Sequence, residues 1–251
     1  MSKNIVNWNV KGIVFISLYD IGCLRYIFPY LHNCYGHDHG KHHKEDIFTH
    51  QMLCGDCLST NNKLLKLSGY LHDIGKPLTY KLDEKTNRYH FKRHEKVGSD
   101  ILKNHLNKRL KFSCGEIEYI SDIVRFHMRE FNEKTKPKAI RKLIKDLENT
   151  KITFKELLKI RIADKRSNLN NEPFTISEIK KRIKLFKIEF NDSKKSFLKL
   201  EINGNDIMKL TGLSPSPKVG QIIKYLSEQI IDNPELNNKD DLKDIVKNYE
   251  R

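Results

Sequence analysis

Apolar side chains recur at three- and four-residue intervals along most of the chain, which is the spacing that places them on one face of an α-helix. Two sequences, Ser113–Glu116 and Thr153–Glu156, have the Ser/Thr-x-x-Glu form of a capping box and predict the starts of two helices. We therefore predict an all-α fold. The helical pattern occurs in residues 12–31, 45–59, 61–74, 93–102, 113–127, 137–147, 153–164, the Lys-rich part of 176–200, and 217–230.

Between two of these helices the pattern changes. Residues 78–82 and 88–91 alternate between apolar and polar side chains around the polar segment 83–87, which predicts a small β-hairpin. After Pro173 the chain becomes rich in lysine, and the tail after Asn233 is polar. We predict two domains, a helical domain at residues 1–172 and a basic C-terminal helical extension at 173–251.

Composition narrows the range of partners and compartments. The 251-residue chain carries 47 lysines and arginines against 32 acidic residues, a formal charge of +15. This charge favours a polyanionic partner, either nucleic acid or a phosphorylated substrate, although a chain rich in Lys, Asn and Ile can also reflect genome composition. Five cysteines, an odd number, argue against a disulfide framework and for a reducing, cytoplasmic location. No run of about 18 apolar residues and no cleavable signal peptide is recognised, so we expect no membrane contact.

The sequence Leu71-His72-Asp73-Ile74-Gly75-Lys76 places an imidazole beside a carboxylate. Gly75 predicts the end of the preceding helix, and Pro77 is expected to prevent its resumption. His72 and Asp73 would then occupy the last turn, about 100° apart around the axis, where the pair can hold one ion or bridge two. An isolated His-Asp pair at a helix end is more often solvated, so further candidate ligands decide the interpretation.

Four more imidazoles and carboxylates lie on the core-facing side or at the end of a predicted helix. His50 and His127 continue apolar stripes, and His94 opens a helix. Asp164 ends an apolar stripe, where a buried carboxylate requires a cation or a hydrogen-bond donor. A lone histidine on such a face is usually a core residue, so the joint order carries the argument. The candidate metal ligands are His50, His72, Asp73, His94, His127 and Asp164.

This set contains imidazoles and carboxylates but no thiolate. Such ligands suit Fe, Mn, Ni, Co or Mg and argue against structural zinc. Six ligands exceed the needs of one ion and a substrate, so we expect one or two divalent metal ions, with Asp73 as the bridge. Bound in this way, two ions can activate water and clamp a phosphoryl group.

Two other clusters receive a different interpretation. The stretch from His32 to His43 is rich in imidazole, but its glycines and polar residues favour a solvated loop, from which only His43 approaches the site as a rim residue. Cys54-Gly-Asp-Cys57 has the Cys-x-x-Cys form. Without a second pair or a βαβ setting, it is more consistent with two small buried side chains than with zinc or redox chemistry.

The order of the six candidate ligands resembles the HD superfamily of metal-dependent phosphohydrolases, including its His-Asp-Ile-Gly form. Over about residues 12–230 the chain also resembles the C-terminal half of bacterial tRNA nucleotidyltransferases (CCA-adding enzymes) that carry an HD domain. The similar segments are Ile21–Pro29, Asp46–His50, Leu71–Lys76, His94-Glu95 with Gly98, Arg109-Leu110, Asn205–Met208 and Pro217–Gly220.

Two departures from those enzymes stand out. No glycine-serine or glycine-glycine loop precedes a strand with paired aspartates, so we do not expect this chain to add nucleotides. The family's Pro-Gly-Pro turn reads Pro215-Ser216-Pro217 here.

The resemblance implies an all-α HD domain that hydrolyses a phosphomonoester or a 2′,3′-cyclic phosphodiester. Its substrate would be a nucleotide or an RNA 3′ end, such as that of tRNA. Asp73 and Lys76 would be catalytic, with Lys76 meeting the substrate phosphate, unless Lys76 is a solvated lysine at a helix end. By motif, the first metal would be bound by His50, His72, Asp73 and Asp164, and the second by His94 and His127 with Asp73 bridging.

Two alternatives remain open from the sequence. The chain could be an RNA-binding module, directed at tRNA, that retains a structural metal site without hydrolysis. It could also be a signalling hydrolase with a small nucleotide substrate that ignores RNA.

Overall fold

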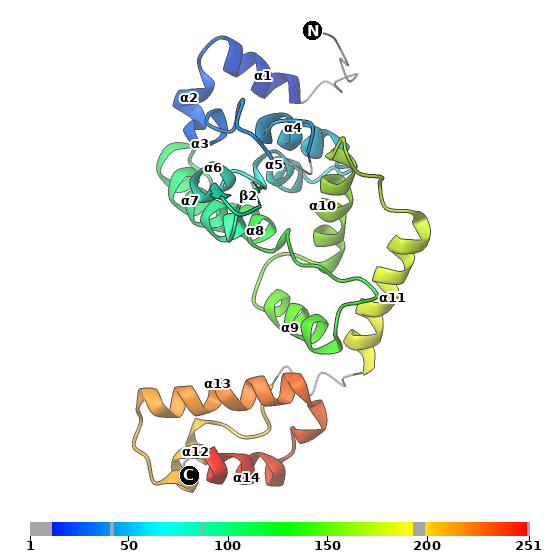
Figure 1. Cartoon of the computed structure of the whole chain (residues 1–251). Helices are drawn as coiled ribbons and strands as arrows, with labels where there is room; N and C mark the ends of the chain where they lie inside the picture. Colours follow the sequence, from blue (N-terminus) through cyan, green and yellow to red (C-terminus); the bar gives the residue numbers. More distant parts are fainter. Residues whose placement is uncertain (1–11, 41–42, 87, 193–198, 250–251) are drawn as a thin grey trace. The chain divides into compact units, whose positions relative to one another are not determined.

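The computed structural model describes residues 12–40, 43–86, 88–192 and 199–249. Over this part of the chain the structure is helical apart from one two-stranded antiparallel hairpin (Figure 1). The predicted all-α bundle with a small hairpin and a C-terminal helical extension is confirmed. Among the described residues, no helix combines the length and the apolar character that a membrane span requires.

The chain forms two compact units. The first comprises residues 1–129 and 150–175, and the second comprises residues 130–149 and 176–251. The sequence-based boundary after residue 172 stays a prediction. The two descriptions differ most at α9 (Pro137–Glu148), which the contacts group with the second unit.

In the first unit, α5 (Lys63–Leu71) lies at the centre, because it contacts α4, α8 and α10. Its apolar face supplies Leu65 and Leu71 to the core. The side chains that follow α5 are therefore buried among three helices. The other elements of this unit are α1 (Gly12–Asp20), α2 (Leu24–Ile27), α3 (Pro29–His32), α4 (Ile47–Cys57), α6 (Lys76–Thr79), α7 (His94–Arg109), α8 (Cys114–Phe126) and α10 (Phe154–Ser167).

Local capping determines where the central helices begin. The predicted capping boxes are both present: Ser113 and Thr153 each accept a hydrogen bond from the backbone of the glutamate three residues later. Asp46 caps α4 and Asn62 caps α5 through their side-chain oxygens. These caps satisfy backbone N–H groups that have no partner inside the helix.

The end of α5 differs from the sequence-based prediction. The helix ends at Leu71 rather than near Ile74, so His72 and Asp73 lie in the connecting turn and not in the last helical turn. Pro77 was expected to prevent a helix, but it lies in the first turn of the short helix α6. Proline is tolerated there because the N–H that it lacks has no helical acceptor.

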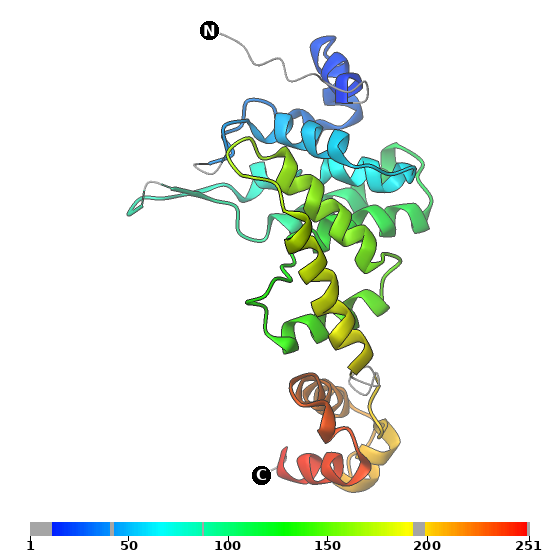
Figure 2. The ribbon, with the colours of Figure 1, turned by 90° about the vertical axis from the view of Figure 1, so that its right-hand side faces the viewer.

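The predicted hairpin is formed by β1 (Lys81–Asp83) and β2 (Arg88–His90). Lys81 pairs with His90 and Leu82 pairs with Tyr89. Figure 2 shows these strands projecting from the helices of the first unit.

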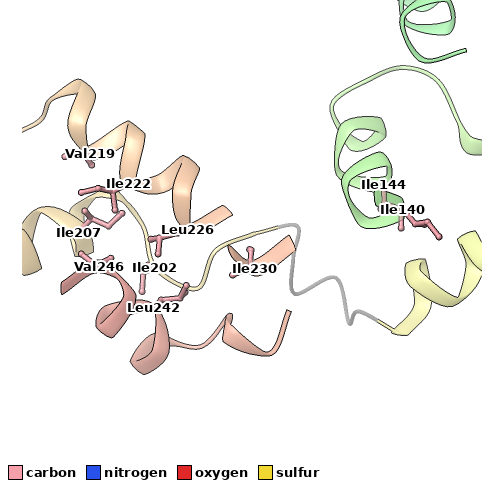
Figure 3. Close-up of a cluster of buried hydrophobic side chains, with 10 residues drawn as sticks. All are labelled: Ile140, Ile144, Ile202, Ile207, Val219, Ile222, Leu226, Ile230, Leu242 and Val246. Atoms are coloured by element: carbon pink, nitrogen blue, oxygen red, sulfur yellow. The ribbon is translucent and has the colours of Figure 1, made fainter. Parts of the chain in front are cut away.

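The second unit has its own apolar core, shown in Figure 3. It contains α9, α11 (Ile176–Asp192), α12 (Gly204–Thr211), α13 (Pro217–Asp232), the 3₁₀ helix η1 (Pro234–Leu236) and α14 (Lys239–Tyr249). The tail after Asn233 was expected to be simply polar, yet α14 buries Leu242 and Val246. The core residues are Ile140, Ile144, Ile202, Ile207, Val219, Ile222, Leu226, Ile230, Leu242 and Val246.

Candidate metal centre

Asp73 is the centre of a cluster of imidazoles in the first unit. Its side chain is almost completely buried in the turn after α5. Nitrogens from five histidines and one lysine lie within 4 Å of its two carboxylate oxygens. From Oδ1, the Nε2 atoms of His94 and His127 lie at 3.2 and 3.5 Å. From Oδ2, the distances are 3.3 Å to His39 Nε2, 3.3 Å to His72 Nε2, 3.8 Å to His50 Nε2 and 2.6 Å to Lys76 Nζ.

Asp164 lies beside this cluster on α10. Its Oδ1 atom is 3.0 Å from His50 Nε2 and 3.7 Å from His72 Nε2. Its Oδ2 atom is 3.0 Å from Arg161 Nη1. The partner that the sequence required for this carboxylate is thus present as two imidazoles and a guanidinium.

All six candidate ligands therefore come together although they are spread over more than 110 residues. They form two groups around Asp73: His50 and His72 lie near Oδ2, with Asp164 beside both of these imidazoles, and His94 and His127 lie near Oδ1. The Nε2 atoms of His94 and His127 are 3.3 Å apart. This grouping matches the two ligand sets expected from the resemblance, while their role as ligands stays a proposal.

The hydrogen bonds of three histidines direct a lone pair toward Asp73. In His72, His94 and His127, Nδ1 lies 2.7–2.9 Å from the backbone carbonyl oxygen three residues earlier. A carbonyl oxygen only accepts hydrogen bonds, so Nδ1 carries the proton and donates it. In the neutral form of each ring, Nε2 is then the nitrogen without a proton, and it faces the centre, as in histidines that bind metals.

The protonation states also suit a cation. Burial lowers the pKa of His127 to about 4, although Asp73 acts in the opposite direction. Burial would raise the pKa of Asp73, but the charges of His72 and Lys76 outweigh it and hold that pKa well below its usual range. Burial would lower the pKa of His72, but the charge of Asp73 outweighs it and raises that pKa. At neutral pH the centre thus contains the carboxylate of Asp73 beside the neutral imidazole of His127, the forms in which these two groups bind a divalent cation.

The residues fit a metal by a further, independent observation. His72 Nε2 and both oxygens of Asp73 are buried and have no hydrogen bond of acceptable geometry within the part of the chain that the structure describes, even though Lys76 Nζ lies close to Oδ2. Buried polar atoms are normally hydrogen-bonded, so these three call for another partner. Two triads, His50–His72–Asp164 and His72–Asp73–His127, each offer ligand atoms within 4.8 Å of one another. The cluster is therefore able to hold a metal ion.

Sequence reasoning missed two residues beside the centre, His39 and Glu45. The stretch from His32 to His43 was interpreted as mostly solvated, and this is wrong for His39, whose residue is only 4% exposed and whose ring stacks on His43. His42 of this stretch lies outside the described residues. A loop without apolar periodicity gives no sign of which side chains turn inward, so no sequence pattern could have selected His39.

Glu45 supports His50 from the side opposite Asp73. Its Oε1 atom accepts hydrogen bonds from Nδ1 of His43, at 2.7 Å, and from Nδ1 of His50, at 3.2 Å. Its Oε2 atom accepts a hydrogen bond from the backbone N–H of Leu169 at 3.3 Å. The carboxylate thus holds His50 with Nε2 directed at Asp73 and Asp164.

The sequence also led to expectations for Lys76 and for the two cysteines of the Cys-x-x-Cys sequence. Lys76 was predicted either to meet a substrate phosphate or to be solvated, and the solvated alternative is excluded because the residue is only 9% exposed. Its Nζ atom contacts Asp73 and His39 and lies 5.5 Å from the centre of the Phe91 ring. Both cysteines of the Cys-x-x-Cys sequence are free thiols; Cys54 is buried as expected, whereas Cys57 is only partly buried.

Comparison of the chain with models of known protein families identifies the family to which it belongs. A model of the HD domain matches residues 35–169, a range that contains all six candidate ligands and more than half of the chain. The chain therefore belongs to the HD domain family.

Two relatives extend the similarity into the second unit. The chain is 24% identical over 223 residues to the A-adding tRNA nucleotidyltransferase of Deinococcus radiodurans, which covers 87% of this chain and 50% of that protein. It is 26% identical over 163 residues to the CC-adding tRNA nucleotidyltransferase of Thermus thermophilus, covering 65% of this chain and 35% of that protein. The chain thus spans half or less of the length of these relatives.

One residue of the resemblance found in the sequence, Arg109, has a side chain that lies outside the described part of the structure.

Proposed function

We propose that this chain is a metal-dependent phosphohydrolase. Its substrate is a phosphomonoester or a 2′,3′-cyclic phosphodiester of a nucleotide or of an RNA 3′ end. The observation that carries the proposal is the convergence of five imidazoles and two carboxylates on one buried point, in the family to which the chain belongs. His50, His72, Asp73 and Asp164 hold one divalent ion, and His94 and His127 share Asp73 for a second.

The chain's own residues have definite roles in this proposal. Bound metal would supply an activated water and a positive charge for the phosphoryl oxygens. Asp73 neutralises part of that charge and joins the two ligand groups. Lys76 reaches the same carboxylate oxygen with Nζ, so it is placed to contact an oxygen of a phosphate bound at the centre. Burial of the cluster strengthens each of these electrostatic interactions relative to water.

The proposal is tested by hydrolysis assays with 2′,3′-cyclic AMP and 2′-AMP in the presence of Fe²⁺, Mn²⁺, Ni²⁺, Co²⁺ or Mg²⁺. We expect wild-type activity with at least one ion and its loss in His72→Ala and Asp73→Ala. Asp100→Asn is the matched control, because Asp100 is an exposed carboxylate on α7 and should retain full activity. Activity that survives in His72→Ala and Asp73→Ala would refute the proposal, as would inactive wild-type protein with all five ions.

A second candidate function is supported by the surface of α11 and by the names of the two relatives. Four lysines on this helix are exposed, Lys180, Lys181, Lys184 and Lys187. We propose as the alternative that the chain binds tRNA and retains the metal site for structure alone. Affinity for tRNA should then fall steeply with salt, because each phosphate contact releases counterions. Absence of tRNA binding at low salt would exclude this candidate.

A further inference from the structure

His39 lies beside the metal centre, although it belongs to neither of the two ligand groups described above. It is part of the loop between α3 and α4, and the residue is only 4% exposed. Its Nε2 atom is 3.3 Å from Oδ2 of Asp73, and Nε2 of His72 lies at the same distance from that oxygen. By distance, His39 is therefore placed as well as a ligand that the sequence predicted.

Hydrogen bonds on both sides of His39 hold the backbone of this loop. The carbonyl oxygen of His37 accepts a hydrogen bond from the N–H of Ile47 at 3.1 Å, which ties the loop to the start of α4. Gly40 has a φ angle of +83°, in the left-handed region that favours glycine, and its N–H donates to Oδ1 of Asp38 at 2.8 Å. These contacts fix the point from which the side chain of His39 enters the centre.

The contact between His39 and Lys76 shows which way a lone pair of the imidazole points. Nζ of Lys76 contacts both Nε2 of His39 and Oδ2 of Asp73. An ammonium group only donates hydrogen bonds, so Nε2 of His39 is the acceptor and carries no proton. One imidazole lone pair and one carboxylate oxygen are thus directed at the same positive charge.

Two acceptor atoms at this separation can also bind one metal ion. Bonds from a divalent ion to an imidazole nitrogen or a carboxylate oxygen are about 2.1 Å long. With two such bonds, the 3.3 Å between Nε2 of His39 and Oδ2 of Asp73 corresponds to an angle of about 100° at the ion. This angle lies between the octahedral and the tetrahedral values. A cavity of about 400 Å³ that is lined by His39, Lys76 and Phe91 gives the ammonium group space into which it can move.

We infer that His39 is a further metal ligand, which binds the ion on the Oδ2 side of Asp73 together with His50 and His72. The ion and the ammonium group of Lys76 compete for the same two atoms. Metal binding therefore moves Lys76 toward the cavity, where an oxygen of the substrate phosphate can meet it. This inference rests on the metal centre of the proposed function and adds a ligand to it.

Titration calorimetry with Mn²⁺ gives the first test, on the full chain and two variants. His39→Phe keeps an aromatic ring that can pack on His43 but offers no lone pair. We expect its Mn²⁺ affinity to be lower than that of wild type by about tenfold or more, because even residues that only orient ligands contribute about 10- to 100-fold. The matched control is His37→Phe in the same loop. It should bind Mn²⁺ like wild type, since the ring of His37 packs against Tyr80.

The proton NMR spectrum at saturating Co²⁺ gives the second test, because it separates a ligand from a residue that acts only through Lys76. An imidazole bonded to paramagnetic Co²⁺ has a strongly shifted, exchangeable N–H signal, whereas an imidazole that merely positions Lys76 has no bond to the ion. We expect one such signal fewer in His39→Phe than in wild type. The number of shifted signals in His37→Phe should equal that of wild type.

Three results would overturn the inference. Equal Mn²⁺ affinity of His39→Phe and wild type is one, and an unchanged number of shifted signals is another, even if the affinity falls. An equal loss of affinity in His37→Phe is the third, because the fold of the loop would then set the affinity. Hydrolysis is measured in parallel. Wild-type protein that binds Mn²⁺ through His39 but hydrolyses neither 2′,3′-cyclic AMP nor 2′-AMP would refute the proposed function and leave the ligand standing.

Discussion

Gly75 holds the turn that carries Asp73 against the first turns of α7. A Cβ atom at Gly75 would lie 2.2 Å from the carbonyl oxygen of His94 and 2.6 Å from the backbone nitrogen of Gly98. Both neighbours are backbone atoms of a helix, so neither can rotate away as a side chain would. Gly75→Ala therefore requires the turn and α7 to separate.

The magnitude follows from the contact. The distance of 2.2 Å is about 1.2 Å shorter than the 3.4 Å at which ordinary contact begins. Overpacking of this kind typically costs about 1–3 kcal/mol of the free energy of unfolding. Because His94 lies 3.2 Å from Asp73, the same movement separates the two groups of candidate ligands. We expect metal affinity to fall by about tenfold or more, as for changes that misplace metal-binding side chains.

Urea unfolding followed by circular dichroism measures the first effect, and titration calorimetry with Mn²⁺ measures the second. Gly115→Ala is the matched control in the same unit. Its Cβ would meet only Nζ of Lys151, at the flexible end of a side chain. That variant should be as stable as wild type or more stable by up to about 1 kcal/mol. Equal stability and equal metal affinity of Gly75→Ala and wild type would refute the close packing described above.

Three further predictions concern other parts of the chain. Glu45→Gln should lower metal affinity about 10- to 100-fold, because a neutral amide oxygen holds the imidazole of His50 more weakly than the carboxylate does; calorimetry with unchanged affinity would contradict this. Burial would raise the pKa of Glu156, but hydrogen bonds from Tyr119 and Thr153 outweigh burial and lower that pKa. The ionised side chain therefore stabilises the fold above about pH 4.5, and this contribution decreases as the pH falls below that value. Glu156→Gln should therefore lose less stability than wild type between about pH 6 and pH 3.5, and parallel losses in urea unfolding would refute this. Leu242→Ala should cost the second unit about 2–5 kcal/mol, whereas an unchanged unfolding midpoint would show that α14 does not pack there.

Helix starts were predictable because capping is a local interaction. Ser113 and Thr153 each bond to a backbone group three residues away, so the sequence contains both partners. The error at Pro77 has the opposite origin. A proline can follow the end of one helix or lie in the first turn of the next. Only the structure, in which the turn at His72 and Asp73 separates α5 from α6, shows that Pro77 belongs to the start of α6.

The burial of His50 and His127 was predictable because helical periodicity gives the direction of a side chain. His50 and His127 follow apolar stripes, and both are buried next to Asp73. His39 and Glu45 lie outside any helix, and contacts with distant parts of the chain determine their positions. Leu169, which is 124 residues from Glu45, is one such partner. The sequence of a loop contains no information of this kind.

The missed helix α14 did have a sequence signal. Leu242, Ile245, Val246 and Tyr249 have helical spacing, and Leu242 and Val246 face the core of the second unit. The many charged residues between them concealed the pattern. In a short segment a few buried side chains are enough to position a helix, because the rest of the surface faces solvent.

The most direct test of this account is the metal content of the purified chain after loading with Fe²⁺ or Mn²⁺ and removal of free ions. We predict one or two ions per wild-type chain, retention in Asp100→Asn, and loss in Asp73→Asn, which removes the carboxylate at the centre of the cluster. Wild-type protein that retains no ion, or Asp73→Asn that retains as many ions as wild type, would contradict the existence of the metal centre.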